Sequence, residues 1–509
     1  MNEAALGTRV HDGRLAVGAP GGHFDVLIIG AGLSGIGAAC HLVQKRPRTT
    51  FALLEARNAM GGTWDLFRYP GIRSDSDMST FGYAFRPWDD KRAIADGPSI
   101  LRYLTETAEA YGVDRHIHFG LKVVRASWRS KDASWTLDVD GPDGEKLGFS
   151  CSFLVFCTGY YEYDDGYMPG WPGMDRFAGR VVHPQKWPED LNYDGKRVVV
   201  IGSGATAVTI VPAMAARAAQ VVMLQRSPTY VAARPVEDAI DKRLRQWLPA
   251  RPALAAVRWK NILLQMYLYR LARRKPAAMR AQIIKLAQAE IGPELNAAEY
   301  FNPRYEPWDQ RLCLVPDGDL FAAMRAGKAS ILNGEIETFT ETGLRLVSGQ
   351  EIAADIIVTA TGLEVRLMGD VAIEVDGSPV DVAATIGYKG AMLSDVPNLA
   401  SIFGYTNASW TLKSDLIAEY LCRLLSHMDR RGYAICTPRL GDAAIAEEPT
   451  LPLTSGYIER AKHLFFKQGT KKPWRLNQNY ALDVMALRFG AIEDGALEFK
   501  RRGPASRAA

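Results

Sequence analysis

The six cysteines of this 509-residue chain include no CxxC or CxxxxC pair. The sequence therefore lacks the dithiol that a disulfide reductase needs, and scattered cysteines are typical of a reducing cytoplasm. An HExxH motif is also absent. His116 and His118 are the only close histidine pair, and no further ligands stand near them in the sequence, so we predict no metal site.

Long apolar runs are missing as well, and none approaches the ~20 residues that a transmembrane helix needs. The N-terminus lacks the basic-then-apolar plan of a secretory signal. We expect a cytoplasmic protein with a disordered extension over residues 1–22 and a disordered tail over 501–509. The length predicts two or three domains, because it exceeds what one core usually organises.

Acidic residues are absent between Lys242 and Ala289, although the net charge of the whole chain is only +4. Apolar residues alternate with the basic ones, which predicts one or two basic amphipathic helices. The favoured interpretation is a helical insertion packed on its parent domain, and the alternative is a membrane-surface contact or a steering field for an anionic cofactor. The twelve basic residues are Lys242, Arg243, Arg245, Arg251, Arg258, Lys260, Arg270, Arg273, Arg274, Lys275, Arg280 and Lys285.

Residues 24–30, FDVLIIG, form a nearly continuous apolar run that indicates a buried parallel strand. The run leads into a GxGxxG motif. Gly30 permits the tight turn, Gly32 leaves room for a pyrophosphate at a helix N-terminus, and Gly35 lets helix and strand pack closely. The next strand ends in Glu55, whose carboxylate can accept hydrogen bonds from a ribose. This order predicts a site for an unphosphorylated adenosine ribose, as in FAD.

Residues 196–202, KRVVVIG, open a second unit with the permitted variant GxGxxA. Here the following strand ends in Gln225, Arg226 and Ser227 where the first unit has its acid. An acid repels a ribose 2′-phosphate, whereas an arginine beside a hydroxyl can bind it. The second unit is therefore predicted to prefer NADPH to NADH.

Together the two units predict an α/β fold with two Rossmann-like dinucleotide-binding domains and mostly parallel sheets. Two apolar strands that end in Thr-Gly, 153–161 and 355–363, mark where the chain is expected to leave the first domain and return to it. We assign residues 23–165 to the first part of the FAD-binding domain, 166–195 to an interdomain linker, 196–354 to an inserted NADPH-binding domain with a basic helical insertion over 237–295, and 355–500 to the second part of the FAD-binding domain.

Residues 177–188, FAGRVVHPQKWP, have no regular apolar period and are predicted to form a loop. They fit the pattern FxGxxxHxxxW followed by Pro, through Phe177, Gly179, His183 and Trp187. This pattern is the signature of type I Baeyer–Villiger flavin monooxygenases, and the chain resembles that family over nearly its whole length. Relatives that oxidise amines and sulfides usually have Tyr or Phe at the last aromatic position. The resemblance implies a hinge that couples NADP binding to domain position.

The motifs and the resemblance together imply two sets of cofactor-binding residues. For FAD they are Gly30, Gly32, Ser34, Gly35, Glu55, Thr63, Trp64, Asp65, Leu66, Asp75 and Val123. For NADP they are Arg73, Ser74, Gly202, Ser203, Gly204, Ala205, Thr206, Ala207, Val208, Arg226 and Ser227. Arg311 is the implied active-site cation, held and tuned by Asp75. Gln310 stands where many relatives have a Lys that contacts the 2′-phosphate, which leaves NADPH selectivity to Arg226 and Ser227.

The activity implied by the resemblance consumes NADPH and O2 and converts ketones to esters or lactones through a C4a-peroxyflavin, with sulfides or thioamides as further substrates. One alternative is an N- or S-oxygenating flavin monooxygenase, against which Trp187 argues. Another is a flavin redox sensor, in which Arg311 and Asp75 have no role. Aromatic residues of 159–173 and 403–415 are candidates for a substrate pocket or for packing. No nucleic-acid partner is expected, because no reading fold accompanies the basic segment.

Overall fold

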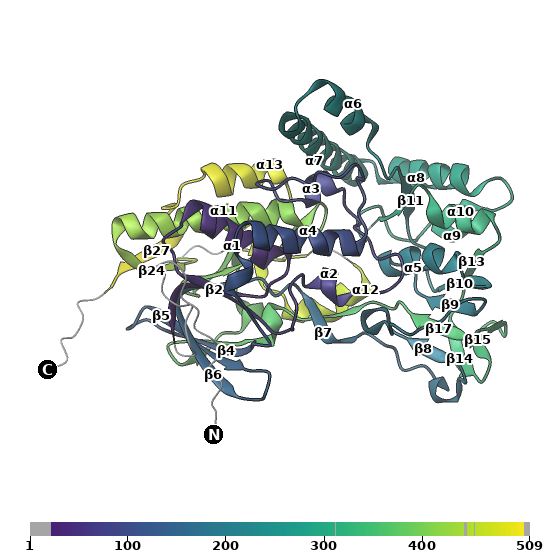
Figure 1. The fold of residues 1–509 in the computed structure, drawn as a ribbon, viewed down its shortest axis with the longest axis horizontal. Coiled ribbons are helices and arrows are strands. Elements are labelled where there is room, and N and C mark those ends of the chain that lie inside the picture. Colours follow the sequence, from purple (N-terminus) through teal and green to yellow (C-terminus); the bar gives the residue numbers. More distant parts are fainter. Residues whose placement is uncertain (1–21, 311, 442–444, 452–453, 503–509) are drawn as a thin grey trace.

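The computed structural model describes residues 22–310, 312–441, 445–451 and 454–502. Two sheets organise the molecule, a nine-stranded one on the left of Figure 1 and a five-stranded one on the right. We call the parts built on them the first and the second half. The predicted α/β fold with two Rossmann-like units is confirmed.

The first sheet is centred on β1 (His23–Ile29), which pairs in parallel with β2 (Phe51–Glu55) and β6 (Lys146–Phe156). β3 (Ile117–Phe119) and β23 (Leu399–Ser401) add parallel strands, while β4 (Lys122–Arg129) and β5 (Ser134–Asp140) join β6 as an antiparallel meander. Val26 and Ile28 pack in one core with helices α1 (Leu33–Lys45) and α11 (Trp410–Arg431). Leu27 and Ile29 pack on the opposite face with Trp128, as the alternation of a strand requires.

The second sheet is wholly parallel, in the order β13 (Ala329–Asn333), β10 (Gln220–Gln225), β9 (Arg197–Ile201), β17 (Ile356–Thr359) and β8 (Arg180–Val182). Helices α5 (Ala205–Ala215) and α10 (Asp319–Arg325) pack together beside it. Each of the two glycine motifs thus lies where the first strand of its unit passes into a helix, as predicted.

Three predicted boundaries differ from the structure. Residue 355 is not the return to the first half, because β17 lies between β9 and β8 in the second sheet. The return follows through β18 (Leu363–Val365), which pairs with β7 (Tyr161–Gly166). The predicted loop over 177–188 includes β8 and the 3₁₀ turn Pro184–Lys186, so part of the expected linker belongs to the second sheet. β27 (Leu497–Arg501) extends one residue into the predicted tail.

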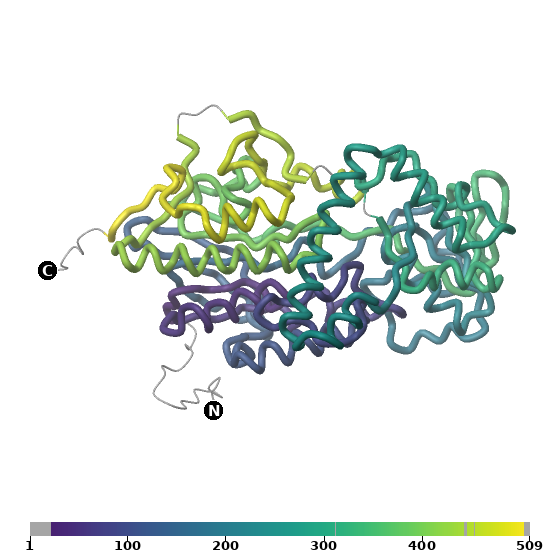
Figure 2. The backbone as a smooth tube through the Cα atoms, turned by 90° about the horizontal axis from the view of Figure 1, so that it is seen from above, coloured from purple at the N-terminus to yellow at the C-terminus, as the bar shows by residue number. Residues whose placement is uncertain are grey.

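The basic insertion is helical, as predicted, and consists of α6 (Ala239–Trp247), α7 (Ala250–Arg274) and α8 (Pro276–Ile291). It does not pack on one domain alone. α8 buries Ile291 in the core of the second half, whereas α7 buries Ile262 in the core of the first. Figure 2 shows the teal helices lying across the junction of the two halves. In the described ranges, no helix is long and apolar enough to cross a membrane.

Apart from 3₁₀ turns, the remaining helices and strands of the described chain fall into two groups. In the first half they are α2 (Thr63–Leu66), α3 (Met78–Phe81), α4 (Gly97–Ala110), β19 (Ala372–Val375), β20 (Ser378–Pro379), β21 (Gly387–Tyr388), β22 (Met392–Leu393), β24 (Tyr433–Pro438), β25 (Glu447–Pro449), α12 (Gly456–Ala461), β26 (Lys467–Gly469), α13 (Tyr480–Asp483) and the π-helical turn Val484–Phe489. Near the second they are β11 (Val231–Arg234), α9 (Ala297–Phe301), β12 (Cys313–Pro316), β14 (Ile336–Thr340), β15 (Gly343–Leu346) and β16 (Glu351–Ala353).

Candidate functional site

The first glycine turn has the geometry that its three glycines predict. Gly30 has φ +101°, a conformation that residues with a side chain rarely adopt. A Cβ on Gly35 would overlap the carbonyl oxygen of Gly30, so helix and strand are in direct backbone contact. A Cβ on Gly32 would have Gly62 Cα, at 3.6 Å, as its nearest neighbour. The turn is therefore tight on its inner side and open at Gly32, which fits a dinucleotide pyrophosphate.

Glu55 ends β2 beside this turn and is buried. Its Oε2 accepts a hydrogen bond from the amide of Ala31 at 2.7 Å, and its Oε1 accepts one from the amide of Arg57 at 3.0 Å. Burial raises the pKa of the carboxyl group, and the two amide hydrogen bonds oppose that rise. The two amides fix the orientation of a carboxylate whose remaining lone pairs can accept ribose hydroxyl groups.

Other predicted FAD residues lie at the start of α1, on α2 and on β4. Asp65 of α2 forms ion pairs with Arg57 at 2.6 Å and with Arg68 at 2.5 Å. Ser34 accepts a hydrogen bond from Nε1 of Trp410 at 2.8 Å, which ties the turn to the start of α11. Trp64, which lies between Thr63 and Asp65 in α2, packs edge-on against Phe81, and Val123 is buried on β4.

The second glycine turn resembles the first but is more open. Gly202 has φ +133°, and a Cβ there would overlap the carbonyl oxygen of Ala360. A Cβ on Gly204 would meet no atom of the described residues within 4 Å. Ser203 Oγ donates to the carbonyl of Ser227 at 3.0 Å. The space above Gly204, at the N-terminus of α5, fits a second pyrophosphate.

At the end of β10, the side chain of Gln225 is buried, whereas the next two side chains are exposed. Gln225 is buried and donates through Nε2 to Asn333 Oδ1 at 2.8 Å and to the Tyr300 carbonyl at 3.0 Å. Arg226 and Ser227 are exposed beside the turn, where a bound nucleotide can reach them. A cation and a hydroxyl at this position suit a 2′-phosphate, and the role of the two residues in binding it stays a prediction.

The segment 69–75 joins the two halves. A Cβ on Gly71 would lie 2.9 Å from the carbonyl oxygen of Thr209 in α5, so the backbones are in close contact. Arg73 forms an ion pair with Asp319, the first residue of α10. Ser74 is buried, and its Oγ donates to the Ser76 carbonyl at 2.6 Å. Arg73 and Ser74, predicted to bind NADP, and Asp75, predicted to bind FAD, thus stand on the strip that touches both units. Arg311 lies outside the described residues.

The predicted signature segment packs into the second half. Phe177 contacts Phe339 edge-on, and a Cβ on Gly179 would overlap the carbonyl oxygen of Asp355. His183 is buried; its Nδ1 accepts from the amide of Gln185 at 3.3 Å and its Nε2 lies 3.3 Å from the Gly362 carbonyl. Both ring nitrogens are satisfied in the neutral form, and burial lowers the pKa of His183. The contact at Nε2 ties the signature segment to Gly362, just after β17.

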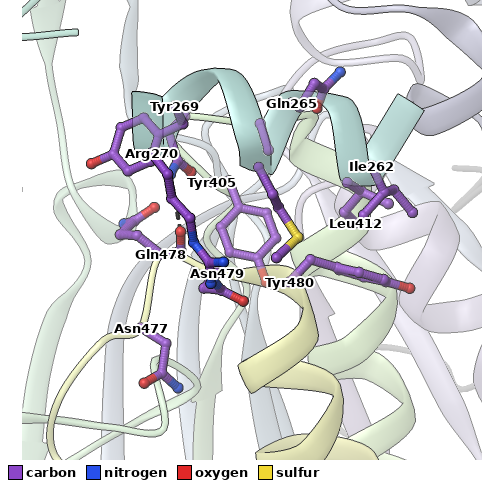
Figure 3. Close-up of a pocket in the computed structure, with 13 residues that line it drawn as sticks. Ile262, Gln265, Tyr269, Arg270, Tyr405, Leu412, Asn477, Gln478, Asn479 and Tyr480 are labelled. Atoms are coloured by element: carbon purple, nitrogen blue, oxygen red, sulfur yellow. Dashed lines mark hydrogen bonds between the residues drawn. The ribbon is translucent and has the colours of Figure 1, made fainter. Parts of the chain in front are cut away.

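A cavity of about 100 Å³ lies between α7 and the segments 405–412 and 477–480 (Figure 3). Its lining residues are Ile262, Gln265, Met266, Tyr269, Arg270, Tyr405, Asn407, Ala408, Leu412, Asn477, Gln478, Asn479 and Tyr480. Carboxamides form one part of the wall, and Oε1 of Gln265 and Oδ1 of Asn407 are buried without a hydrogen-bond partner among the described residues. From the two aromatic segments considered as pocket walls, 403–415 contributes to this cavity and 159–173 does not.

Packing explains the other aromatic residues of those segments. Tyr160 stacks on Trp410, with ring centroids 5.5 Å apart, and Phe403 lies 4.9 Å from the same indole. Because Trp410 also binds Ser34, this aromatic cluster supports the first glycine turn.

No motif in the sequence singles out Asp77, yet it anchors α7 to the first half. Its carboxylate is fully buried and accepts hydrogen bonds from Asn261 at 3.0 Å, Gln265 at 2.9 Å and the amide of Thr80 at 3.1 Å. Gln265 also lines the cavity, and Asp77 lies two residues after the strip 69–75. The carboxylate therefore links the helical insertion to the strip that touches both units.

Known proteins with similar sequences are monooxygenases. The chain is 50% identical over 481 residues to the FAD-containing monooxygenase EthA of Mycobacterium tuberculosis, covering 94% of this chain and 98% of that protein. It is 52% identical to the putative FAD-containing monooxygenase MymA of the same species, with 94% and 97% covered. The probable FAD-binding monooxygenase AlmA of Acinetobacter baylyi is 46% identical, with the same coverage.

Solved structures share the fold. An oxidised steroid monooxygenase bound to NADP superimposes with a TM-score of 0.76 at 22% identity, covering 94% of this chain and 100% of that one. An open form of cyclohexanone monooxygenase gives a TM-score of 0.71 at 21% identity, with 94% and 99% covered. The model of the family described as flavin-binding monooxygenase-like matches residues 25–366, a range that contains both glycine turns. The prediction of a flavin monooxygenase is thereby confirmed, and the chain belongs to the flavin-binding monooxygenase-like family.

Proposed function

We propose that this enzyme is an FAD- and NADPH-dependent Baeyer–Villiger monooxygenase. It inserts one oxygen atom of O2 beside a ketone carbonyl to give an ester or lactone, and NADPH and a proton reduce the other atom to water. The observation that supports it most is the contrast between equivalent strand ends: Glu55 is buried after β2, and Arg226 is exposed after β10. The end of β2 suits a nucleotide without a 2′-phosphate, and the end of β10 suits a nucleotide that carries one.

The residues present fit both cofactors. Gly32 and Gly204 leave space at the two helix N-termini, Glu55 would accept the adenosine ribose hydroxyls of FAD, and Arg226 with Ser227 would hold the 2′-phosphate of NADPH. When bound, FAD supplies hydride acceptance from NADPH and the activation of O2. The similarity to FAD-containing monooxygenases and to an NADP-bound monooxygenase structure supports this assignment.

Arg311 and Asp75 are proposed to act on the substrate. Arg311 is a permanent cation that would stabilise the negative charge forming on the carbonyl oxygen during attack, and Asp75 would position it. The contact between segment 69–75 and α5 would keep water from this region. Sulfides and thioamides are further proposed substrates. The location proposed is the cytoplasm, which the six scattered and buried cysteines support.

The test uses the purified holoenzyme with NADPH and, in separate assays, a ketone, an amine and a sulfide. The proposal is supported if NADPH is consumed only when a ketone is present and the product is an ester with one oxygen atom more than the ketone. An N-oxide from an amine without any ester would indicate the alternative N-oxygenating enzyme. Arg311→Ala should abolish ester formation and leave reduction of the flavin by NADPH intact, and the exposed Arg304→Ala is the matched control. Ester formation retained in Arg311→Ala would overturn the role of Arg311.

A further inference from the structure

The outer side of α7 is apolar where a helix at a protein surface is usually polar. Its inner side packs against the first half through Val257 and Ile262. Trp259, Leu263 and Tyr267 follow at four-residue spacing on the opposite side, and all three are exposed, Tyr267 to 62%. Spacing of four places them in one stripe along the helix.

Two neighbouring segments extend this stripe. Trp247, at the tip between α6 and α7, is 81% exposed. On the other side, Met485 and Phe489 of the π-helical turn are exposed, Phe489 to 67%. Trp259 contacts the ring of Tyr480 at the start of α13, which brings the two segments together, and Figure 1 shows α6, α7 and α13 along the same upper edge. We define the apolar face as Trp247, Trp259, Leu263, Tyr267, Met485 and Phe489.

Exposed cations border this face at both ends of α7. Lys242 and Arg243 of α6 and Arg251 lie before or at the start of α7, and Arg270 and Arg274 lie at the end of α7. No acidic residue occurs from 242 to 289. Aromatic and aliphatic side chains between basic residues are typical of helices that lie in the headgroup region of an anionic bilayer.

We propose that the apolar face docks on the surface of an anionic lipid membrane. The indole of Trp247 and the side chains of the α7 stripe would insert among the headgroups while the arginines and lysines bind lipid phosphates. A second copy of the chain fits less well. Both ends of α7 are cationic, so either orientation of a self-contact places like charges opposite each other.

The apolar face lies next to the cavity. Tyr480 contacts Trp259 of the face and also lines the cavity, and Arg270 belongs to both the cationic border and the cavity wall. The bilayer and the cavity would then be separated by single side chains. This inference concerns attachment and does not depend on the reaction proposed above.

The test is flotation of the full-length holoenzyme with vesicles of phosphatidylglycerol and phosphatidylcholine in equal parts, or of phosphatidylcholine alone. The wild-type protein should float with the mixed vesicles and much less with the neutral ones. Added salt should weaken its binding to the mixed vesicles. Trp247→Ser combined with Leu263→Ser and Tyr267→Ser should lower the partition coefficient at least about tenfold, because each exposed apolar side chain adds to binding. Val347→Ser changes an equally exposed apolar residue of the second half, 66% exposed, and should float like wild type.

A second variant, Met485→Ser with Phe489→Ser, tests the apolar face without changing α6 or α7, and it should also weaken flotation. Bound flavin and melting temperature verify that each variant is folded. A wild-type protein that stays with the soluble fraction in both lipid mixtures overturns the proposal, and so do variants that float like wild type. A wild-type dimer that the triple variant converts to monomer, without vesicle binding, would assign the face to a second copy.

Discussion

Gly204→Ala separates nucleotide binding from folding at the second glycine turn. Gly204 has φ −78° and ψ −175°, which any residue adopts, and a Cβ there would meet nothing within 4 Å in the part of the chain that the structure describes. The variant should therefore fold as well as wild type. Its free energy of unfolding should stay equal or rise by about 0.4–1 kcal/mol, because alanine restricts the unfolded chain.

Binding of NADPH should suffer, because the new methyl group occupies the space left for the pyrophosphate at the N-terminus of α5. Loss of one hydrogen bond between a backbone amide and a charged phosphate removes about 1.5–3 kcal/mol. That corresponds to an increase of about 10- to 100-fold in the KM for NADPH. The assay is steady-state NADPH oxidation with a saturating ketone, together with chemical denaturation and the visible spectrum of bound FAD.

Two glycine variants serve as controls. Gly148→Ala on β6 also adds a methyl group to open space, far from the turn, and should leave both KM and stability unchanged. Gly202→Ala should fail to fold properly, because its Cβ would overlap Ala360 and its φ is +133°. An unchanged KM for NADPH in Gly204→Ala would refute the placement of the pyrophosphate.

Three further predictions concern single side chains. Arg226→Ala should reduce the preference for NADPH over NADH about 10- to 100-fold in kcat/KM without loss of stability, since Arg226 is exposed; equal ratios in the two enzymes would contradict its role. Asp77→Ala should lower the free energy of unfolding by about 3 kcal/mol, because Asn261, Gln265 and the Thr80 amide lose a buried acceptor, and denaturation at pH 7 measures this. Burial lowers the pKa of His183 from its ordinary value of 6.5. As the pH decreases through this range, the unfolded chain binds a proton that the folded chain resists, so the free energy of unfolding decreases. His183→Asn should lessen that fall between pH 7.5 and 5.5, and an identical slope would refute it.

The parts of the site that were predictable are local in the chain. The turns at Gly30 and Gly202, Glu55 after β2 and the exposed Arg226 each follow from a strand, a turn and a helix that are consecutive in sequence. Their geometry is fixed by backbone contacts a few residues apart, so a short motif is sufficient to identify them.

Long-range pairing explains what was missed. β8 and β17 are adjacent in the second sheet although they lie far apart in the sequence, and neither strand's residues indicate which sheet it joins. The hydrogen bonds from Asn261 and Gln265 to Asp77 connect residues 184 and 188 positions apart. No periodicity in either segment predicts such a contact, and the cavity likewise forms from three separate stretches.

The most direct test of the proposed function is the fate of labelled oxygen. The holoenzyme is incubated with NADPH, ¹⁸O2 and a panel of linear, cyclic and aryl ketones, and the products are analysed by mass spectrometry against NADPH consumed. The account predicts an ester or lactone with a single ¹⁸O atom, formed in a ratio near one to the NADPH oxidised. NADPH oxidation that yields only hydrogen peroxide, with every ketone recovered unlabelled, would contradict it.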